Sequence, residues 1–217
     1  MAGTLTGLPE ADAGGRDLRV TPFAMANTVR ETGGTDFSEN LQAGIDVKWG
    51  VTRSLALDLT VNPDFAQVEA DQQRVNLTQF SLFFPEKRQF FLENSGVFYM
   101  GDAARNTRAS TSIRPDEDLL PFFSRRIGIS DTGQQIPILA GSRLSGKITD
   151  GITVGLLNMQ TDEIGGNAPA NNFTVARARQ DLPNRSSIGG LFVNKIATGT
   201  RARANDYNRT YAVDGRV

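Results

Sequence analysis

The feature that most constrains this chain is a strict two-residue alternation of apolar and polar side chains. It is clearest in two neighbouring segments, "GIDVKWG" (44–50) and "LALDLTVN" (55–62). This period is the pattern of a β-strand with two different faces, because successive side chains of a strand point to opposite sides. The intervening "VTRS" fits a short turn, so we expect the two segments to pair as an antiparallel hairpin.

Strand-like segments of roughly ten residues recur along the chain. We expect further strands at 18–30, 121–130, 137–149, 152–161, 172–182, 186–195 and 207–217. In the first of these, Pro22 favours an edge or end position, because proline cannot donate a ladder hydrogen bond. Glycines inside later strands are common where a barrel wall bends or an inner segment presses close.

The connections between these segments alternate in length. Short turns are expected at 149–151 ("TDG") and 182–186 ("LPNRS"). Longer polar connections are expected at 31–40, 162–171 and 196–206. Tight turns at one end and long loops at the other are typical of an up-and-down outer-membrane barrel. Alternation alone would also suit a soluble β-sandwich.

Composition removes several classes of chemistry. The 217 residues include no Cys and no His, which excludes thiol nucleophiles, His bases, Ser-His-Asp triads and His/Cys metal sites. We therefore expect no metal and no cofactor. The formal net charge of −1 gives no support to a nucleic-acid partner. No run of about 18 apolar residues predicts a membrane-spanning helix.

The ends of the chain also carry expectations. The opening "MAGTLTGLPEADAGG" lacks the basic start and apolar run of a signal peptide. We expect 1–17 to be a flexible lead-in and 18–217 to be an incomplete β-barrel domain. The last segment (207–217) runs to the final residue inside a strand pattern, so we expect the rest of the barrel strands elsewhere in the same polypeptide.

A non-repetitive block, 62–118, interrupts the strands and is expected to fold into the lumen or cap one mouth. Its centre is "FFPEKRQFFLENSGVF" (83–98). Pro85 fits the first turn of a short helix and Gly96 its end, with Phe90 and Phe91 packed inward. Acidic and basic residues are concentrated in this block and at the Arg125–Arg126 pair that follows it. This candidate polar cluster comprises Asp64, Glu69, Asp71, Arg74, Glu86, Lys87, Arg88, Glu93, Arg125 and Arg126.

Several roles remain open for this cluster. Carboxylate pairs such as Asp64 with Glu69, or Glu86 with Glu93, could hydrolyse a glycoside. The acids of "DFAQVEAD" (64–71) could bind Ca²⁺ through oxygen ligands, although their spacing is not that of an EF-hand. They could also form a recognition surface. The interpretation that we favour is a salt-bridge cluster that pins the folded-in block to the wall. Further wall groups would be Asp46, Lys48, Asp58, Arg143 and Lys147.

The long block, "VNPDFAQVEADQQRVNLTQFSLFFPEKRQFFLENSGVF" (61–98), together with "FFSRRIG", "PILAGSRLSGKI" and "GLLNMQT", resembles the bacterial proteins grouped as domain of unknown function 5916. The likeness runs from about Leu18 to Val217. It implies an outer-membrane β-barrel in Gram-negative bacteria, usually preceded by a domain like a family-nine carbohydrate-binding module, which is not visible in this chain. The family's activity is not established, so the resemblance carries over no catalytic residue.

These observations lead to one expectation and two alternatives. We expect an all-β chain, a partial antiparallel up-and-down β-barrel of the outer-membrane type with an irregular, partly helical insert. It would contact outer-membrane lipid, would not be an enzyme, and would serve transport, export or surface binding of glycan or peptide material. The alternatives are a surface hydrolase of carbohydrate that uses acids of 62–93, and a soluble β-sandwich binding module.

Overall fold

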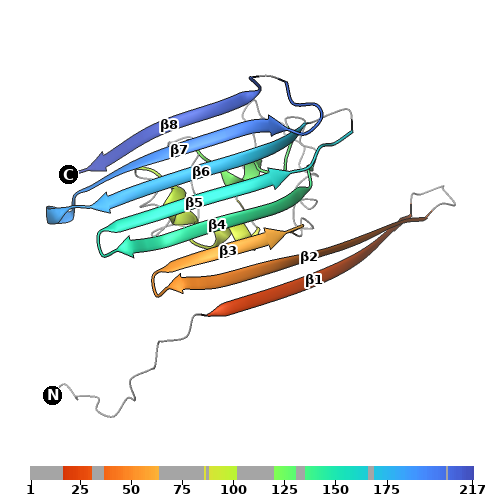
Figure 1. Ribbon diagram of the computed structural model, residues 1–217, viewed down its shortest axis with the longest axis horizontal. Helices are drawn as coiled ribbons and strands as arrows, with labels where there is room; N and C mark the ends of the chain where they lie inside the picture. The colour runs from red at the N-terminus through yellow and green to blue at the C-terminus, as the bar shows by residue number, and fades with distance from the viewer. Residues whose placement is uncertain are drawn as a thin grey trace, which may run out of the picture.

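The computed structural model describes residues 17–30, 37–63, 86, 88–101, 120–130, 135–165, 169–203 and 205–217. These residues form an all-β fold with one antiparallel sheet, in which the strands lie side by side in their order along the chain (Figure 1). The strands are β1 (Leu18–Arg30), β2 (Phe37–Thr52), β3 (Leu55–Val61), β4 (Ile138–Thr149), β5 (Ile152–Thr161), β6 (Ala170–Asp181), β7 (Ser187–Thr198) and β8 (Tyr207–Arg216).

The helical pieces are all short. They are α1 (Gln89–Leu92), η2 (Ser95–Phe98), η3 (Ser124–Arg126) and η4 (Pro183–Arg185), which forms the turn between β6 and β7. No helix in the described ranges is long and apolar enough to cross a membrane. The expected up-and-down antiparallel sheet is thus confirmed. Its edges are β1 and β8, and within the described residues no backbone pairing joins them.

Two expectations about local structure are wrong. Residues 121–130 do not form a strand but turn through η3, and Ile129 makes a single bridge to Gln135. The connection expected at 31–40 ends earlier, because β2 begins at Phe37 and continues the ladder with β1 as far as Arg30. In both places contacts made with residues outside the segment decide the backbone, against local preference.

One face of the sheet, here called the inner face, is covered by an inner segment. This segment comprises the described residues between 86 and 136, and in Figure 1 its helical turns, coloured yellow to green, lie behind the central strands. Its aromatic and aliphatic side chains form the core with the inner faces of β4 to β7. The buried core residues are Phe91, Phe98, Met100, Phe122, Ile127, Ile138, Leu157, Met159, Val175 and Leu191.

Gly155 on β5 allows the inner segment to approach closely. A Cβ at this position would lie 2.8 Å from Val97 and 2.9 Å from Phe98, both on η2. Such a distance is closer than carbon atoms approach without displacement, so the missing side chain lets η2 lie directly on the strand. Phe91 and Phe98, each 5% exposed, then contribute about 1.5–3 kcal/mol each by burial.

The opposite face, here called the outer face, is apolar and exposed. The register places one apolar or aromatic residue from every strand in a single row across it. That row is Leu18, Trp49, Leu57, Leu144, Leu156, Ala176, Phe192 and Tyr211. Of these, Leu18, Leu156 and Tyr211 are 62%, 48% and 72% exposed. No described element packs over this row to bury it.

The outer face becomes polar toward the long connections of β5 and β6, whereas Ile196 and Tyr207 remain exposed on it at the same end of β7 and β8. Asn158 donates hydrogen bonds to Asn172 at 3.0 Å and to Thr174 at 2.9 Å. Gln160 donates to the Thr198 hydroxyl at 2.8 Å. On β2 and β3, by contrast, apolar side chains such as Leu41 and Val61 continue toward the same end of the sheet. The apolar band therefore runs obliquely across the strands.

Candidate functional site

A row of charged residues crosses the inner face of the first four strands. The register aligns Arg19, Lys48, Asp58 and Arg143 on β1 to β4. The row continues through Leu157, Val175 and Val193 on β5 to β7. Along this row, charge is thus confined to the first four strands, and the next three carry apolar core residues.

Arg143 connects the sheet to the inner segment. Its guanidinium donates two hydrogen bonds to Oδ2 of Asp58, from Nε at 3.1 Å and Nη2 at 2.7 Å. Nη1 donates to the backbone carbonyls of Phe90 and Glu93. Arg143 is 2% exposed and Asp58 is 5% exposed. The same guanidinium therefore neutralises a buried carboxylate and holds the end of α1 against β4.

Glu93 completes this group from the inner-segment side. Its carboxylate pairs with Lys48 Nζ and lies 3.9 Å from Nη2 of Arg143. The neighbouring Asn94 donates a hydrogen bond to the Ser145 hydroxyl at 3.2 Å. Two carboxylates and two cations, from three strands and the inner segment, thus join into one network.

A second network lies within the inner segment around Arg88. Its Nε and Nη2 donate to the two carboxylate oxygens of Glu86, at 2.8 and 2.7 Å. Nη1 and Nη2 also donate to the carbonyls of Ile127 and Ser124, both at 2.8 Å. The guanidinium lies 4.2 Å from the centre of the Phe91 ring. Arg88 therefore fixes α1 to the turn of η3, which explains why 121–130 folds back instead of extending.

The carboxylate of Glu86 is held in its ionised form. Burial alone would raise the pKa of this carboxyl, but the hydrogen bonds and charge of Arg88, with a hydrogen bond from the Ser124 hydroxyl, outweigh burial and lower the pKa. Burial, assisted by the charge of Glu86 and opposed by a hydrogen bond with Ser95, raises the pKa of the Tyr99 phenol. Tyr99 thus stays protonated at neutral pH.

A third ion pair spans β7. Arg177 on β6 reaches Asp214 on β8, with Nη2 donating to Oδ2 at 2.8 Å and Nη1 lying 2.6 Å from Oδ1. Gly189 on β7 lies beneath this contact, and a Cβ there would be 2.7 Å from Nη1. Asp214 also accepts a hydrogen bond from the Gly101 backbone N–H at 3.0 Å. The pair therefore fastens the inner segment to the sheet at Gly101.

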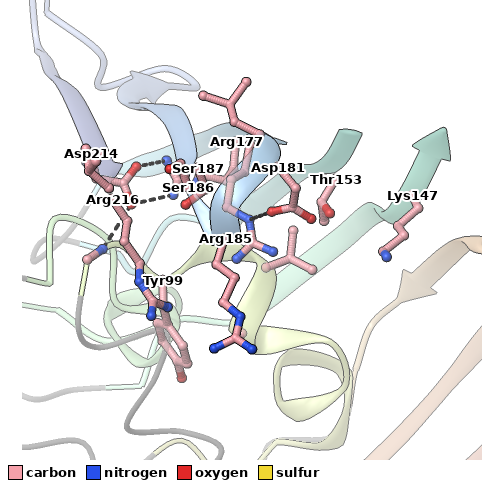
Figure 2. Close-up of a pocket in the computed structure, with 17 residues that line it drawn as sticks. Tyr99, Lys147, Thr153, Arg177, Asp181, Arg185, Ser186, Ser187, Asp214 and Arg216 are labelled. Carbon is pink, nitrogen blue, oxygen red and sulfur yellow. Dashed lines mark hydrogen bonds and ion pairs between the residues drawn. The ribbon is translucent and has the colours of Figure 1, made fainter. Parts of the chain in front are cut away.

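A cavity of about 1140 Å³ adjoins this pair. It lies on the inner face at the tight-turn end, between Gly96 to Gly101 of the inner segment and the ends of β4 to β8. Figure 2 shows Lys147, Arg185 and Arg216 extending from three different elements around it. Five of its lining residues are cations: Lys147, Arg177, Arg179, Arg185 and Arg216. Two are acids, Asp181 and Asp214.

Five of the ten residues of the predicted polar cluster lie in the part of the chain that the structure describes. Asp64, Glu69, Asp71, Arg74 and Lys87 lie outside the described residues. Glu86 and Arg88 lie together in the second network, and Glu93 lies in the first with Lys48, Asp58 and Arg143. Arg125 is buried in η3, whereas its neighbour Arg126 is exposed. In the described part of the chain, no group of three or more acids could hold a metal ion.

Sequence reasoning missed the Arg177–Asp214 pair and the cavity beside it. One signal was available: Arg177 and Arg179 are two residues apart in a strand, so they share a face. The Gly189–Gly190 pair was a second, because glycine in a strand marks a close approach. Neither signal identifies Asp214 as the partner, because that depends on the register of β6 to β8.

Comparison with known proteins gives one match. The sequence profile described as domain of unknown function (DUF5916) matches residues 16–207, which include seven of the eight strands in full and the whole inner segment. Searches of curated proteins and of solved structures returned no match. Because the profile covers most of the chain, the chain belongs to the DUF5916 family.

Proposed function

We propose that this chain forms part of the wall of an outer-membrane β-barrel in a Gram-negative bacterium, with the inner segment inside the barrel. The barrel would serve transport, export or surface binding of glycan or peptide material. One observation carries the proposal: the ion pairs and the core face inward, and all eight strands present an apolar or aromatic residue outward.

The size of the outward apolar row favours lipid over water as its surroundings. Neighbouring strands lie about 4.8 Å apart, so a row across eight strands extends roughly 34 Å. Soluble monomers rarely expose contiguous apolar patches above a few hundred Å². Contact with lipid acyl chains removes this surface from water without a second protein layer.

The oblique course of the apolar band supports a tilted arrangement of the strands. Strands of an outer-membrane barrel are inclined by about 35–45° to the membrane normal. A band of constant depth in the membrane must then cross the rows of paired residues at an angle. The displacement of the band between β2 and β6 has this form, because apolar residues extend to Leu41 on β2, while Asn158 and Asn172 are already polar on β5 and β6.

The two edges of the sheet need partner strands, which the rest of the barrel would supply. β1 and β8 each present one side without a described partner strand, and exposed edges of this length invite aggregation. Closure by further strands of the same polypeptide would satisfy both edges. We therefore expect the full-length protein, and not the isolated sheet, to be the stable unit.

The hydrolase alternative is less well supported. A general acid in glycoside hydrolysis needs a raised pKa, whereas the pKa of Glu86 is lowered. Glu93 is bound by Lys48 and adjoins Arg143. A soluble sandwich would need a second sheet over the outer row, and the described residues contribute none.

Membrane fractionation of the full-length protein tests the proposal. Cells that produce it are separated on a density gradient that resolves inner from outer membranes, with a known outer-membrane porin and a periplasmic protein as markers. The protein should follow the porin and should require detergent for extraction. Recovery with the periplasmic marker in the aqueous fraction would refute the proposal.

A further inference from the structure

We propose that the cavity at the tight-turn end binds a multivalent oxyanion, a soluble ligand that carries two or more phosphate or carboxylate groups. This inference rests on the proposed function in one respect: the cavity is taken to open into the barrel interior. It adds the chemical class of the ligand, which the barrel proposal leaves open.

The charge around the cavity is unbalanced. Arg177 pairs with Asp214, and Nε of Arg179 lies 3.3 Å from Asp181. These two pairs use both acids of the lining. Lys147, Arg185 and Arg216 have no ion pair and no side-chain hydrogen bond within the described residues. Three positive charges therefore face one cavity without a counter-charge from this part of the protein.

The three cations come from separate elements that converge on the cavity. Lys147 lies on β4, Arg185 in the turn between β6 and β7, and Arg216 at the end of β8. Isolated unpaired Arg and Lys side chains are ordinary on a protein surface. All three are exposed, and their convergence around one hollow, with Arg177 at its wall, lets a single anion contact several cations at once. Repulsion among like charges disfavours the arrangement unless an anion occupies it.

A buried, incompletely paired group lies at the same place. Arg177 is 3% exposed, and its Nε has no hydrogen-bond partner among the described residues. A buried donor without a partner costs free energy, and the same guanidinium adds a fourth positive charge to the wall beside the three exposed cations. Opposite it, the Tyr99 side chain and the backbone of Gly101 line the cavity from the inner segment.

The guanidinium groups and the volume specify the kind of anion. Arg binds phosphate and carboxylate through two parallel hydrogen bonds. A cavity of about 1140 Å³ is at the upper end of small-molecule sites, which are about 300–1,000 Å³. It therefore has room for a ligand with several anionic groups. Because the cavity is on the inner face, a soluble anion fits it better than the headgroup of a lipid at the outer face.

Calorimetric titration of the full-length protein in a zwitterionic detergent, with inorganic tripolyphosphate as the probe at low salt, tests the inference. We expect saturable binding to the unaltered protein. The double variant Arg185→Gln/Arg216→Gln should bind at least about tenfold more weakly, since two charge-assisted contacts are lost. The matched control is Arg201→Gln/Arg203→Gln, which removes the same charge from the loop between β7 and β8, outside the cavity. It should change the affinity less than about twofold.

Each other outcome is informative. No saturable binding, or an equal loss in the two double variants, would overturn the inference. Competition by an added anionic lipid but not by a soluble carboxylate such as citrate would also overturn it, because the ligand would then be a headgroup. Circular dichroism of each variant verifies that the sheet is intact. Saturable binding by a protein that does not fractionate with outer membranes would refute the barrel and retain the anion site.

Discussion

The strongest single prediction concerns Arg143, which connects the sheet to the inner segment. Replacing Arg143 by Met keeps an unbranched side chain as far as the Nε position but leaves the Asp58 carboxylate, 5% exposed, without its counter-charge. It also removes the donor to the carbonyls of Phe90 and Glu93. Breaking a buried ion pair by removing one partner costs about 3–5 kcal/mol, so we expect a loss of stability in this range.

The measurement is urea unfolding of the full-length protein in detergent micelles, followed by tryptophan fluorescence. The control is Lys147→Met on the same strand and the same face. Lys147 is exposed and forms no ion pair within the described residues, so its replacement should change the free energy of unfolding by less than about 0.5 kcal/mol. The double variant Asp58→Asn/Arg143→Met should recover part of the loss, because no buried charge is then left unpaired.

Two outcomes would refute the reasoning about Arg143. If Arg143→Met and Lys147→Met lowered the stability equally, the buried network would have no special role. If the double variant were clearly less stable than Arg143→Met, the effects of the two substitutions would add. The ion pair between Asp58 and Arg143 would then not be the source of the loss.

Three further predictions follow from single residues. Gly155→Ala should cost about 1–3 kcal/mol, because the new Cβ would be 2.8 Å from Val97. Gly190→Ala, whose new Cβ would make only an ordinary contact of 3.9 Å with the Ala212 carbonyl oxygen, should cost less in the same urea assay. Since the pKa of Glu86 is lowered from 4.5, its ionised form stabilises the fold above that value, and the contribution is lost as pH falls through the lowered pKa. The stability difference between the unaltered protein and Glu86→Gln should thus be constant from pH 6 to 8 and shrink below about pH 4.5. Leu156→Arg, on the outer row, should lower the yield of membrane-inserted protein, with a cost of about 2–4 kcal/mol if it lies at the midplane; normal insertion would count against lipid contact.

The strands could be predicted from the sequence where alternation is strong. The hairpin of β2 and β3 and the tight turns at 149–151 and 182–186 were read from local pattern, and the structure has them. The start of β2 at Phe37 could not be predicted in this way, because "FSEN" contains the turn-forming residues Ser38 and Asn40 and follows a Gly-rich stretch. Its backbone is extended because β1 supplies the partner, which is information from outside the segment.

The inner segment could be predicted only in outline. Its aromatic residues indicated packing, and Phe91 and Phe98 are indeed buried. The strand expected at 121–130 was wrong because the carbonyls of Ser124 and Ile127 accept hydrogen bonds from Arg88, which is distant in sequence. The pairing of Arg177 with Asp214 depends on strand register and on the lack of a side chain at Gly189, neither of which a local pattern specifies.

The central claim, that the outer face contacts lipid, can be tested directly with single cysteines, since these 217 residues contain none and any cysteine elsewhere in the full-length protein can be replaced by Ser. Single cysteines at Phe192 and Val213 (outer) and at their neighbours Val193 and Ala212 (inner) place probes on opposite faces of β7 and β8. Each variant of the full-length protein, labelled with an environment-sensitive fluorophore in bilayers, is measured with and without nitroxide-bearing acyl chains. Our account predicts strong quenching at positions 192 and 213 and weak quenching at 193 and 212. Equal quenching at adjacent positions, or water-like emission at 192 and 213, would contradict it.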